Sequence, residues 1–240
     1  MAGARHRPDP ALKLRTIGLL GGSFNPAHAA HRRISLYALA ALGLDEVWWL
    51  VSPGNVLKPV EGMAGLTTRV AAARRVARRA PIRVSAIEAE MGTRFTVDTL
   101  ARLQRRYPKI RFVWLMGADN LAQFHRWRDW RAIARMMPIA VIARPGYDTR
   151  AVASPAMAWL RRWRRRHGQD RLDKDGFGAR RSTPALYQLR FDPDPLSATA
   201  IRAADPDWHR RNPASAPRDM LTFRLVQPGT VLSSPRKARS

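Results

Sequence analysis

Short apolar runs and longer amphipathic stretches alternate along the first 150 residues. The apolar runs are bounded by glycine, proline or charged residues, which is typical of strands buried on both faces of a parallel sheet. They lie at 16–22, 46–52, 82–88, 110–117 and 138–144. Between them, apolar residues recur at spacings of three and four, which predicts amphipathic helices. These helices lie at 29–43, 66–79 and 96–107, with a helical or mixed segment from the end of the fourth strand to about 136.

This order of elements predicts an α/β fold. Strands that alternate with helices form βαβ units, and right-handed crossovers place helices on both faces of the sheet. We therefore expect a doubly wound, mostly parallel, Rossmann-like sheet. In such sheets a ligand binds outside the carboxyl ends of the strands, where the strand order reverses. The loops that follow the strands are thus expected to line one cleft.

The pattern weakens beyond residue 150. It predicts a basic helix at 156–168, a polar loop at 169–184, a sixth strand at 185–191, and a short helix at 197–204 with Ser197 as its N-cap.

Composition suggests three parts. Residues 1–15 read as a basic, flexible leader, and 16–204 as one domain with a basic, insertion-like stretch at about 151–185. Residues 205–240 are rich in proline, arginine and serine and form a divergent tail, for which disorder and a shifted reading frame are both open.

Several classes of protein are disfavoured by composition. The 240 residues include no cysteine, which excludes disulfides and thiolate metal sites. No apolar run approaches the roughly 20 residues needed to cross a bilayer. The leader lacks the apolar stretch of a signal peptide. We expect a cytoplasmic protein with no membrane partner.

The formal net charge of +25 comes almost entirely from arginine. A basic surface attracts polyanions, so a nucleic-acid partner must be considered. The arginines are, however, spread over predicted helix faces and not gathered in one tract. This favours a generally basic surface, with no specific nucleic acid as partner, and it also suits a phosphate-bearing substrate.

The stretch GGSFNPAHAAH follows the first predicted strand. Gly21 and Gly22 would let the backbone turn tightly towards a helix N-terminus, where free N–H groups favour an anion. The spacing matches neither a GxGxxG dinucleotide fingerprint nor a Walker P-loop. His28 and His31 fall on one side of the first helical turn, where they could donate hydrogen bonds to a phosphate. A zinc pair would need a third ligand, and two incidental polar residues remain an alternative.

This stretch resembles the signature of the nucleotidyltransferase superfamily with a His-x-Gly-His motif, with Ala30 in the glycine position. Five further motifs, in order, resemble those of bacterial nicotinate mononucleotide adenylyltransferases: SPGNVLK, RFTVDTL, WLMGADNLAQFHRW, VIARPGY and PLSATAIR. The resemblance covers about 16–147 and resumes at 195–202. It implies adenylyl transfer from ATP to nicotinate mononucleotide, which gives deamido-NAD and pyrophosphate in NAD biosynthesis. It also implies Mg²⁺ held mainly by the ATP phosphates, with no metal site on the protein itself.

The resemblance also implies the roles of individual residues. The expected catalytic residues are His28, His31, Lys58 and Arg202. The residues expected to bind ATP are Gly21, Gly22, Ser23, Phe24, His28, His31, Gly117, Asp119, Ser197, Thr199 and Arg202. Those expected to bind nicotinate mononucleotide are Ser23, Asn55, Lys58, Phe95, Thr96, Trp127 and Arg144.

Several of these residues have a purely structural alternative. Ser23, Thr96 and Asp119 could be helix caps, Trp127 could be a core tryptophan, and Lys58 could be a solvated loop cation.

Two other functions remain open. A sibling transferase would act on nicotinamide mononucleotide or phosphopantetheine. A basic nucleic-acid-binding protein, suggested by charge alone, would bind DNA or RNA in a salt-sensitive manner and release no pyrophosphate.

Overall fold

The computed structural model describes residues 14–54, 62–142, 151–165, 183–191, 197–210 and 216–228. Several predictions lie outside these residues, namely most of the leader, most of the loop at 169–184, and the site residues Asn55, Lys58 and Arg144.

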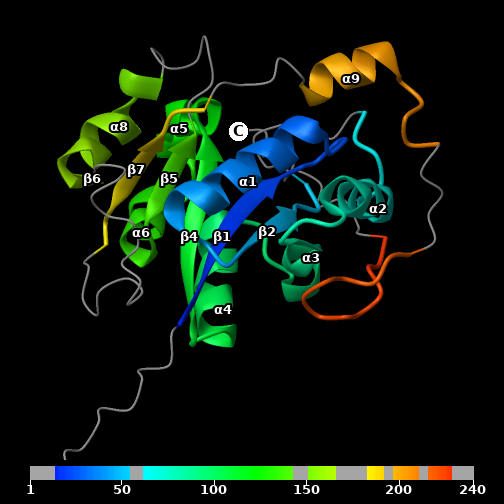
Figure 1. The fold of residues 1–240 in the computed structure, drawn as a ribbon, viewed down its shortest axis with the longest axis horizontal. Helices are drawn as coiled ribbons and strands as arrows, with labels where there is room; N and C mark the ends of the chain where they lie inside the picture. Colours follow the sequence, from blue (N-terminus) through cyan, green and yellow to red (C-terminus); the bar gives the residue numbers. More distant parts are fainter. Residues whose placement is uncertain are drawn as a thin grey trace, which may run out of the picture.

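The described residues form a seven-stranded sheet in the order β3-β2-β1-β4-β5-β7-β6 (Figure 1). Every pair of neighbouring strands runs parallel. The strands are β1 (Arg15–Gly22), β2 (Glu46–Val51), β3 (Ile82–Ser85), β4 (Ile110–Gly117), β5 (Ile139–Ile142), β6 (Arg164–Arg165) and β7 (Leu186–Leu189). The chain moves outward from β1 to β3 and then returns to β4 on the other side of β1. The strand order therefore reverses between β1 and β4, and the predicted doubly wound α/β fold is confirmed.

Helices cover both faces of this sheet. They are α1 (Ala29–Leu42), α2 (Leu66–Ala77), α3 (Ile87–Met91), α4 (Thr96–Arg106), α5 (Ala118–Gln123), η1 (Phe124–Arg126), α6 (Trp130–Met136), α8 (Pro155–Leu160), η2 (Arg161–Trp163) and α9 (Ala198–Ala204). Successive residues of β4 point to opposite faces: Val113 packs with α1 and α2 in one core cluster, and Trp114 packs with α4, α5 and α6 in the other. Helix α9 lies beyond the carboxyl ends of the strands, near the start of α1 (Figure 1).

Two predicted elements end earlier than their apolar patterns suggest. The third strand stops at Ser85, and Ile87–Met91 forms the short helix α3, which ends at Gly92 with a φ of 62°. The basic helix predicted at 156–168 ends at Leu160, and Arg164 begins β6. The backbone of Arg164 and Arg165 pairs with β7 and so cannot continue the helix, and local periodicity does not encode this pairing.

The described part of the basic, insertion-like stretch 151–185 packs into the domain. Residues Ala156, Met157 and Leu160 of α8 are buried in the second core cluster. Strand β6 extends the sheet at its edge. These described residues therefore contribute to the core and to the sheet of the domain.

Residues 216–228, here called the C-terminal segment, pack against the outer edge of β3. The backbone N–H of Met220 donates to the carbonyl of Val84 at 3.2 Å, and the N–H of Val84 donates to Met220 Sδ at 3.3 Å. An antiparallel bridge between Arg218 and Leu225 closes the segment on itself. The segment covers an edge strand that would otherwise expose unpaired backbone groups. Disorder, one of the possibilities left open for the tail over 205–240, therefore does not apply to residues 216–228, whereas the divergence of the tail stays a prediction.

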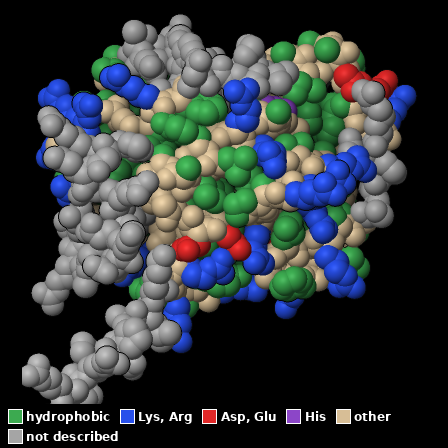
Figure 2. Space-filling model, viewed as in Figure 1, with side chains coloured by type: hydrophobic (Ala, Val, Ile, Leu, Met, Phe, Trp, Pro, Cys, Tyr) green, Lys and Arg blue, Asp and Glu red, His purple; other side chains and the backbone are tan. Residues whose placement is uncertain are grey.

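The surface bears on the expected partners. Lys and Arg side chains form several separate groups over the face shown in Figure 2, in keeping with arginines spread over helix faces. Within the described ranges, no helix combines the length and apolar character needed to cross a membrane.

Candidate active site

A cavity of about 840 Å³ opens at the carboxyl ends of the strands, where the strand order reverses. This volume is near the upper end of the roughly 300–1,000 Å³ that is usual for small-molecule sites. Its walls come from the segments after β1, β2 and β4, from α3 and the start of α4, and from the start of α9. The predicted site residues that line it are Gly21, Gly22, Ser23, Phe24, His28, His31, Phe95, Thr96, Gly117, Asp119, Trp127, Ser197 and Thr199. The structure thus brings together segments separated by up to 178 residues of sequence, although the roles of these residues towards particular substrates stay predictions.

At the end of β1, Gly21 serves close packing, and our interpretation that Gly21 and Gly22 make the tight turn is wrong. Both Gly21 and Gly22 are still part of the strand. A Cβ atom on Gly21 would lie 2.5 Å from the indole of Trp114, so only glycine fits there. The chain turns at Phe24, whose φ is 46°. This left-handed conformation is uncommon for a non-glycine residue and marks a locally strained loop.

The ring of Phe24 packs from the core side against the histidine corner, by which we mean His28 and His31 at the start of α1. Phe24 is 2% exposed. Its ring stacks on Trp49 with 5.0 Å between centroids and lies 4.9 Å from the ring of His31. The imidazole of His31 is therefore held on an aromatic platform that fixes where it can point.

The two histidines lie side by side at the start of α1. His28 is the N-cap, and its ring centroid is 3.9 Å from that of His31. The backbone N–H of His28 donates to Nδ1 of His31 at 3.2 Å. A neutral imidazole that accepts at Nδ1 carries its proton on Nε2. This hydrogen bond selects the tautomer in which His31 can donate from Nε2 to a ligand oxygen.

Arg69 is a site-forming residue that our sequence reasoning missed. It is 1% exposed and points from α2 under the loops that follow β1 and β2. Its guanidinium donates to the carbonyls of Ser23 and Ser52 at 2.7 Å each, and to those of Ala64 at 2.8 Å and Pro53 at 3.4 Å. Burial lowers the pKa of Arg69 to about 10, so the group remains charged at neutral pH. It joins two cavity-forming loops through their backbones.

Helix α9 contacts the loop after β1. Ser197 accepts from the N–H of Ala200 at 3.1 Å, so its predicted role as N-cap is confirmed. Arg202 is not among the cavity-lining residues. Its guanidinium donates to the carbonyl of Asn25 at 2.6 Å and to the hydroxyl of Thr199 at 3.4 Å. Arg202 thus joins α9 to the histidine corner at the rim of the cavity.

Three of the structural alternatives can be judged. Ser23 is not a helix cap, because α1 begins with His28 as N-cap. Thr96 is the first residue of α4, whose N-cap is Phe95. Asp119 lies in the first turn of α5, where the N-cap is Gly117 and no side chain caps the helix. The side chains of Ser23, Thr96 and Asp119 are therefore not explained by capping.

Aromatic and basic side chains form another part of the cavity wall, here called the aromatic and basic wall. Trp127 lines the cavity and also packs edge-on against Phe124 and Trp114, so it is both a core and a cavity residue. Two guanidinium groups lie over the ring of Phe95, that of Arg128 at 4.7 Å and that of Arg94 at 5.8 Å from the centroid. Cation–π contacts of this kind hold arginines near a ring while leaving N–H groups available. This wall suits a planar, anionic ligand.

Glu88 on α3 also lines the cavity and was not predicted as a site residue. Burial raises the pKa of its carboxyl to about 7, although a hydrogen bond with Thr99 opposes the shift. The hydroxyls of Thr93 and Thr99 are hydrogen-bonded to each other at 2.7 Å beside it. We missed this residue because it falls in the stretch 82–88, which was predicted to be the third strand. The apolar pattern of that stretch does not indicate which side chain lines the cavity.

The raised pKa of Glu88 predicts a pH-dependent stability. Below pH 4.5 the carboxyl is protonated in both the folded and unfolded states. Between pH 4.5 and about 7 it ionises only when unfolded, so the free energy of unfolding falls as the pH rises, and the loss persists above pH 7. Glu88→Gln removes this penalty, so we expect it to stabilise the protein by about 2–3 kcal/mol at pH 8 and by much less at pH 5. Urea unfolding at the two pH values measures the difference.

A matched control is available on the same helix. Glu90 pairs with Arg106 at 3.2 Å, so Glu90→Gln removes a compensated carboxylate and should bring no gain in stability at pH 8. Equal gains for Glu88→Gln at pH 5 and pH 8 would contradict the assignment.

The carboxylates of the cavity do not form a metal site by themselves. Asp119 and Glu88 both line it. Over the residues that the structure describes, however, no group of three or more histidine, aspartate or glutamate side chains could hold a metal ion. A divalent cation at this site would thus need most of its oxygen ligands from a bound ligand or from water.

Comparison with known proteins identifies relatives over most of the chain. A family model described as cytidylyltransferase-like matches residues 19–204. A protein of Erythrobacter litoralis named "Probable nicotinate-nucleotide adenylyltransferase" is 63% identical over 209 residues, which cover 87% of this chain and 93% of that protein. A protein of the same name from Bradyrhizobium sp. ORS 278 is 51% identical over 193 residues, covering 80% of this chain and 97% of that protein.

Solved structures share the fold. The nicotinic acid mononucleotide adenylyltransferase of Plasmodium falciparum, complexed with NaAD, superposes with a TM-score of 0.56 at 16% identity, over 79% of this chain and 83% of that one. The same enzyme complexed with APC gives a TM-score of 0.54. At this identity the likeness concerns the fold alone.

Proposed function

We propose that this chain, which belongs to the cytidylyltransferase-like family, transfers the adenylyl group of ATP to nicotinate mononucleotide. The products are deamido-NAD and pyrophosphate, which makes the reaction a step of NAD biosynthesis. Relatives at 51–63% identity carry the name of this activity. The observation that carries the proposal is a single cavity that joins the paired histidines to an aromatic and basic wall at the start of α4.

The reaction needs alignment and charge stabilisation more than proton transfer. A 5′-phosphate oxygen of the mononucleotide attacks the α-phosphorus of ATP. The bond from that phosphorus to the α,β-bridging oxygen breaks, and pyrophosphate leaves with the electron pair. The nucleophile is already anionic, so no general base is required. Catalysis then depends on holding the two phosphates in line and on stabilising the developing charge.

The histidine corner is suited to that stabilisation. We assign His31 to the α-phosphate, because it lines the cavity and the hydrogen bond accepted at Nδ1 places the proton of the neutral ring on Nε2. His28 lies beside it and lines the same cavity. Donors fixed before the reaction stabilise transition-state charge without reorganisation, which is the largest single contribution in many enzymes.

The other phosphates of ATP are assigned to α9. Ser197 and Thr199 line the cavity there. Arg202 lies at the rim, where its guanidinium donates a hydrogen bond to Thr199. It would bind the leaving pyrophosphate through charge-assisted hydrogen bonds. Gly117 and Asp119 line the cavity after β4 and are assigned to the adenosine side. Lys58 remains a predicted phosphate ligand outside the described residues.

The aromatic and basic wall is assigned to the acceptor. The first turn of α4 has N–H groups with no partner within the helix, and these favour the nicotinate carboxylate near Thr96. Trp127 offers a ring face for stacking on the pyridine. Arg94 and Arg128 add positive charge above Phe95. Asn55 and Arg144 remain predicted contacts to this substrate.

Magnesium is proposed to enter with ATP. When bound, it would screen the charge of the triphosphate, and Asp119, which lines the cavity after β4, would contact its water shell. The chain's own contribution would remain the histidine donors and the cations around the phosphates.

The test is release of pyrophosphate by the purified full-length protein with ATP and Mg²⁺. Separate reactions contain nicotinate mononucleotide, nicotinamide mononucleotide or phosphopantetheine. We expect turnover with the first and a clear preference for it over the second. Turnover only with one of the other acceptors would identify a sibling transferase. No pyrophosphate from folded protein, together with salt-sensitive binding of DNA or RNA, would replace the proposal by the nucleic-acid alternative.

A further inference from the structure

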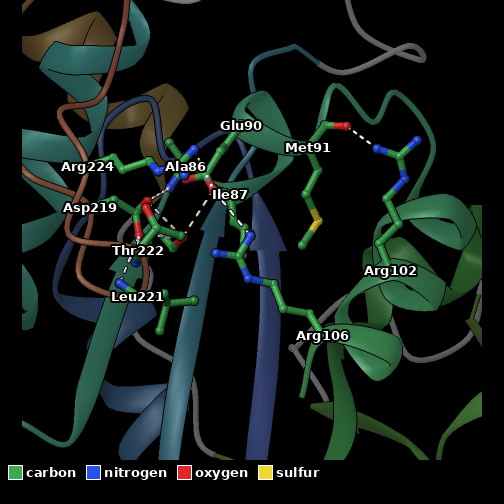
Figure 3. Close-up of polar contacts among 11 residues, drawn as sticks. Ala86, Ile87, Glu90, Met91, Arg102, Arg106, Asp219, Leu221, Thr222 and Arg224 are labelled. Carbon is green, nitrogen blue, oxygen red and sulfur yellow. Dashed lines mark hydrogen bonds and ion pairs between the residues drawn. The ribbon is translucent and has the colours of Figure 1, made fainter. Parts of the chain in front are cut away.

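Asp219 in the C-terminal segment caps the start of α3 (Figure 3). The side chain is buried, with the residue only 4% exposed. One carboxylate oxygen, Oδ2, accepts from the backbone N–H of Ala86 at 2.6 Å and from the hydroxyl of Ser85 at 2.8 Å. The other, Oδ1, accepts from the N–H groups of Leu221 and Thr222 at 2.8 and 3.1 Å, and it also lies 3.0 Å from the hydroxyl of Ser85. One carboxylate thus joins a turn of the C-terminal segment to the junction of β3 and α3, 134 residues away in sequence.

The hydroxyl of Ser85 extends this connection into the helix. It donates to Asp219 and accepts from the backbone N–H of Ile87 at 3.1 Å. The first N–H groups of a helix have no partner within the helix and need one from outside. Asp219 satisfies that need directly at Ala86 and, through Ser85, at Ile87.

Helix α3 is also held from α4, on its other side (Figure 3). Glu90 pairs with Arg106 of α4 at 3.2 Å and with Arg224 of the C-terminal segment at 3.7 Å. The guanidinium of Arg102 donates to the carbonyl of Met91. A five-residue helix is not stable by itself in water, so its place depends on such external contacts.

Helix α3 leads directly into the part of the cavity wall that is assigned to the acceptor. Glu88 of α3 lines the cavity, and so do Arg94, Phe95 and Thr96, which directly follow α3 in the chain. Thr93 connects the two parts, since its backbone N–H donates to the carbonyl of Glu88 at 3.0 Å and its hydroxyl contacts Thr99 of α4 at 2.7 Å. A shift at the start of α3 would therefore move this wall, whereas the histidine corner belongs to different elements.

We propose that Asp219 is a positioning residue for the acceptor: it holds α3, and through α3 the Glu88 to Thr96 wall, in the arrangement that binds nicotinate mononucleotide. The inference rests on the proposed function, because it takes this wall to be the acceptor side. The C-terminal segment is then part of the machinery for substrate selection although it touches no substrate.

Asp219→Asn is the most specific variant for a test. It keeps the size of the side chain and one carbonyl oxygen to accept from Leu221 and Thr222. It replaces the oxygen that accepts from Ala86 by an amide donor, so the bond to Ala86 is lost, while the retained oxygen can still accept from Ser85 and from the turn of the segment. We expect the KM for nicotinate mononucleotide to rise about tenfold, with the KM for ATP and kcat changed by less than about twofold. Calorimetric titration with nicotinate mononucleotide should show the same loss of affinity without turnover.

The controls separate positioning from general stability. Asp207→Asn makes the same chemical change in a side chain that is 61% exposed and should leave every parameter unchanged. Ser85→Ala removes the link to Ile87 but leaves the bond from Asp219 to Ala86, so we expect a smaller selective rise in the acceptor KM. It also keeps the test open if Asp219→Asn does not fold.

The outcomes are distinguishable. Unchanged acceptor KM in both variants overturns the inference. Equal rises in both KM values, or a lower melting temperature with unchanged acceptor affinity, would show a merely structural role and also overturn it. Absence of pyrophosphate release by the wild-type protein would instead refute the proposed function.

Discussion

His31→Asn is expected to lower kcat for pyrophosphate release by about 10²–10³-fold, with little change in either KM. The side-chain oxygen of asparagine can lie where Nδ1 of the imidazole lies, and can still accept from the N–H of His28. No atom of asparagine reaches the position of Nε2. The variant therefore keeps the local hydrogen bond of the α1 N-terminus and removes the donor assigned to the α-phosphate, together with the ring contacts to Phe24 and His28. Because that contact is strongest in the transition state, its loss should appear in kcat.

His31→Ala completes this comparison. It removes both the donor and the acceptor, so we expect a similar loss of kcat and an added loss of about 1 kcal/mol in the free energy of unfolding. His209→Ala is the matched control, because His209 lies on the exposed surface after α9. Steady-state assays together with urea unfolding measure both effects. If His31→Asn retained kcat within about twofold of wild type, His31 would have no direct part in the chemistry.

Arg69→Met is expected to cause the largest loss of stability, about 3–5 kcal/mol. Methionine has a similar length but donates no hydrogen bond, so the four carbonyls now satisfied by Arg69 would be left without their donor. Two of those carbonyls belong to Ser23 and Ser52, which lie next to the cavity, so the KM values for both substrates should rise. Urea denaturation and steady-state kinetics provide the two measurements.

Two further variants sharpen this prediction. Arg69→Lys keeps a charge but offers a single nitrogen in place of the planar fork, so its loss of stability should be intermediate. Arg78→Met replaces an exposed arginine just after α2 and should change stability by less than about 0.5 kcal/mol. A free energy of unfolding for Arg69→Met within about 1 kcal/mol of wild type would mean that water replaces the guanidinium at little cost.

The sheet and the location of the cleft followed from local patterns. A strand buried on both faces must be apolar throughout, and a helix that packs on a sheet must be apolar on one side, so the alternation of the two patterns predicted the doubly wound fold. The parallel arrangement then brings the carboxyl ends of the strands to one edge, which is why residues as distant as His31, Thr96 and Ser197 could be expected in one cavity. All three line it.

Short-range geometry was equally predictable. Residues three apart share one side of a helical turn, so the contact between His28 and His31 follows from their spacing alone. Ser197 caps α9 because the hydroxyl of a serine just before a helix can accept from the backbone N–H three residues later, here that of Ala200.

The order of most elements, the doubly wound parallel sheet and the pair of histidines at its first corner could be predicted from the sequence, because each depends on residues that are neighbours along the chain or on a rule common to all parallel sheets. Three contacts became visible only in the folded chain: Arg69 joins two loops, Trp114 leaves room for nothing larger than glycine at position 21, and Asp219 binds the N-cap of a helix 133 residues earlier. An arginine, a glycine and an aspartate have no local periodicity that reveals such partners. Their roles arise when distant backbone groups are buried and need a donor, an acceptor or space, and that need exists only in the folded chain.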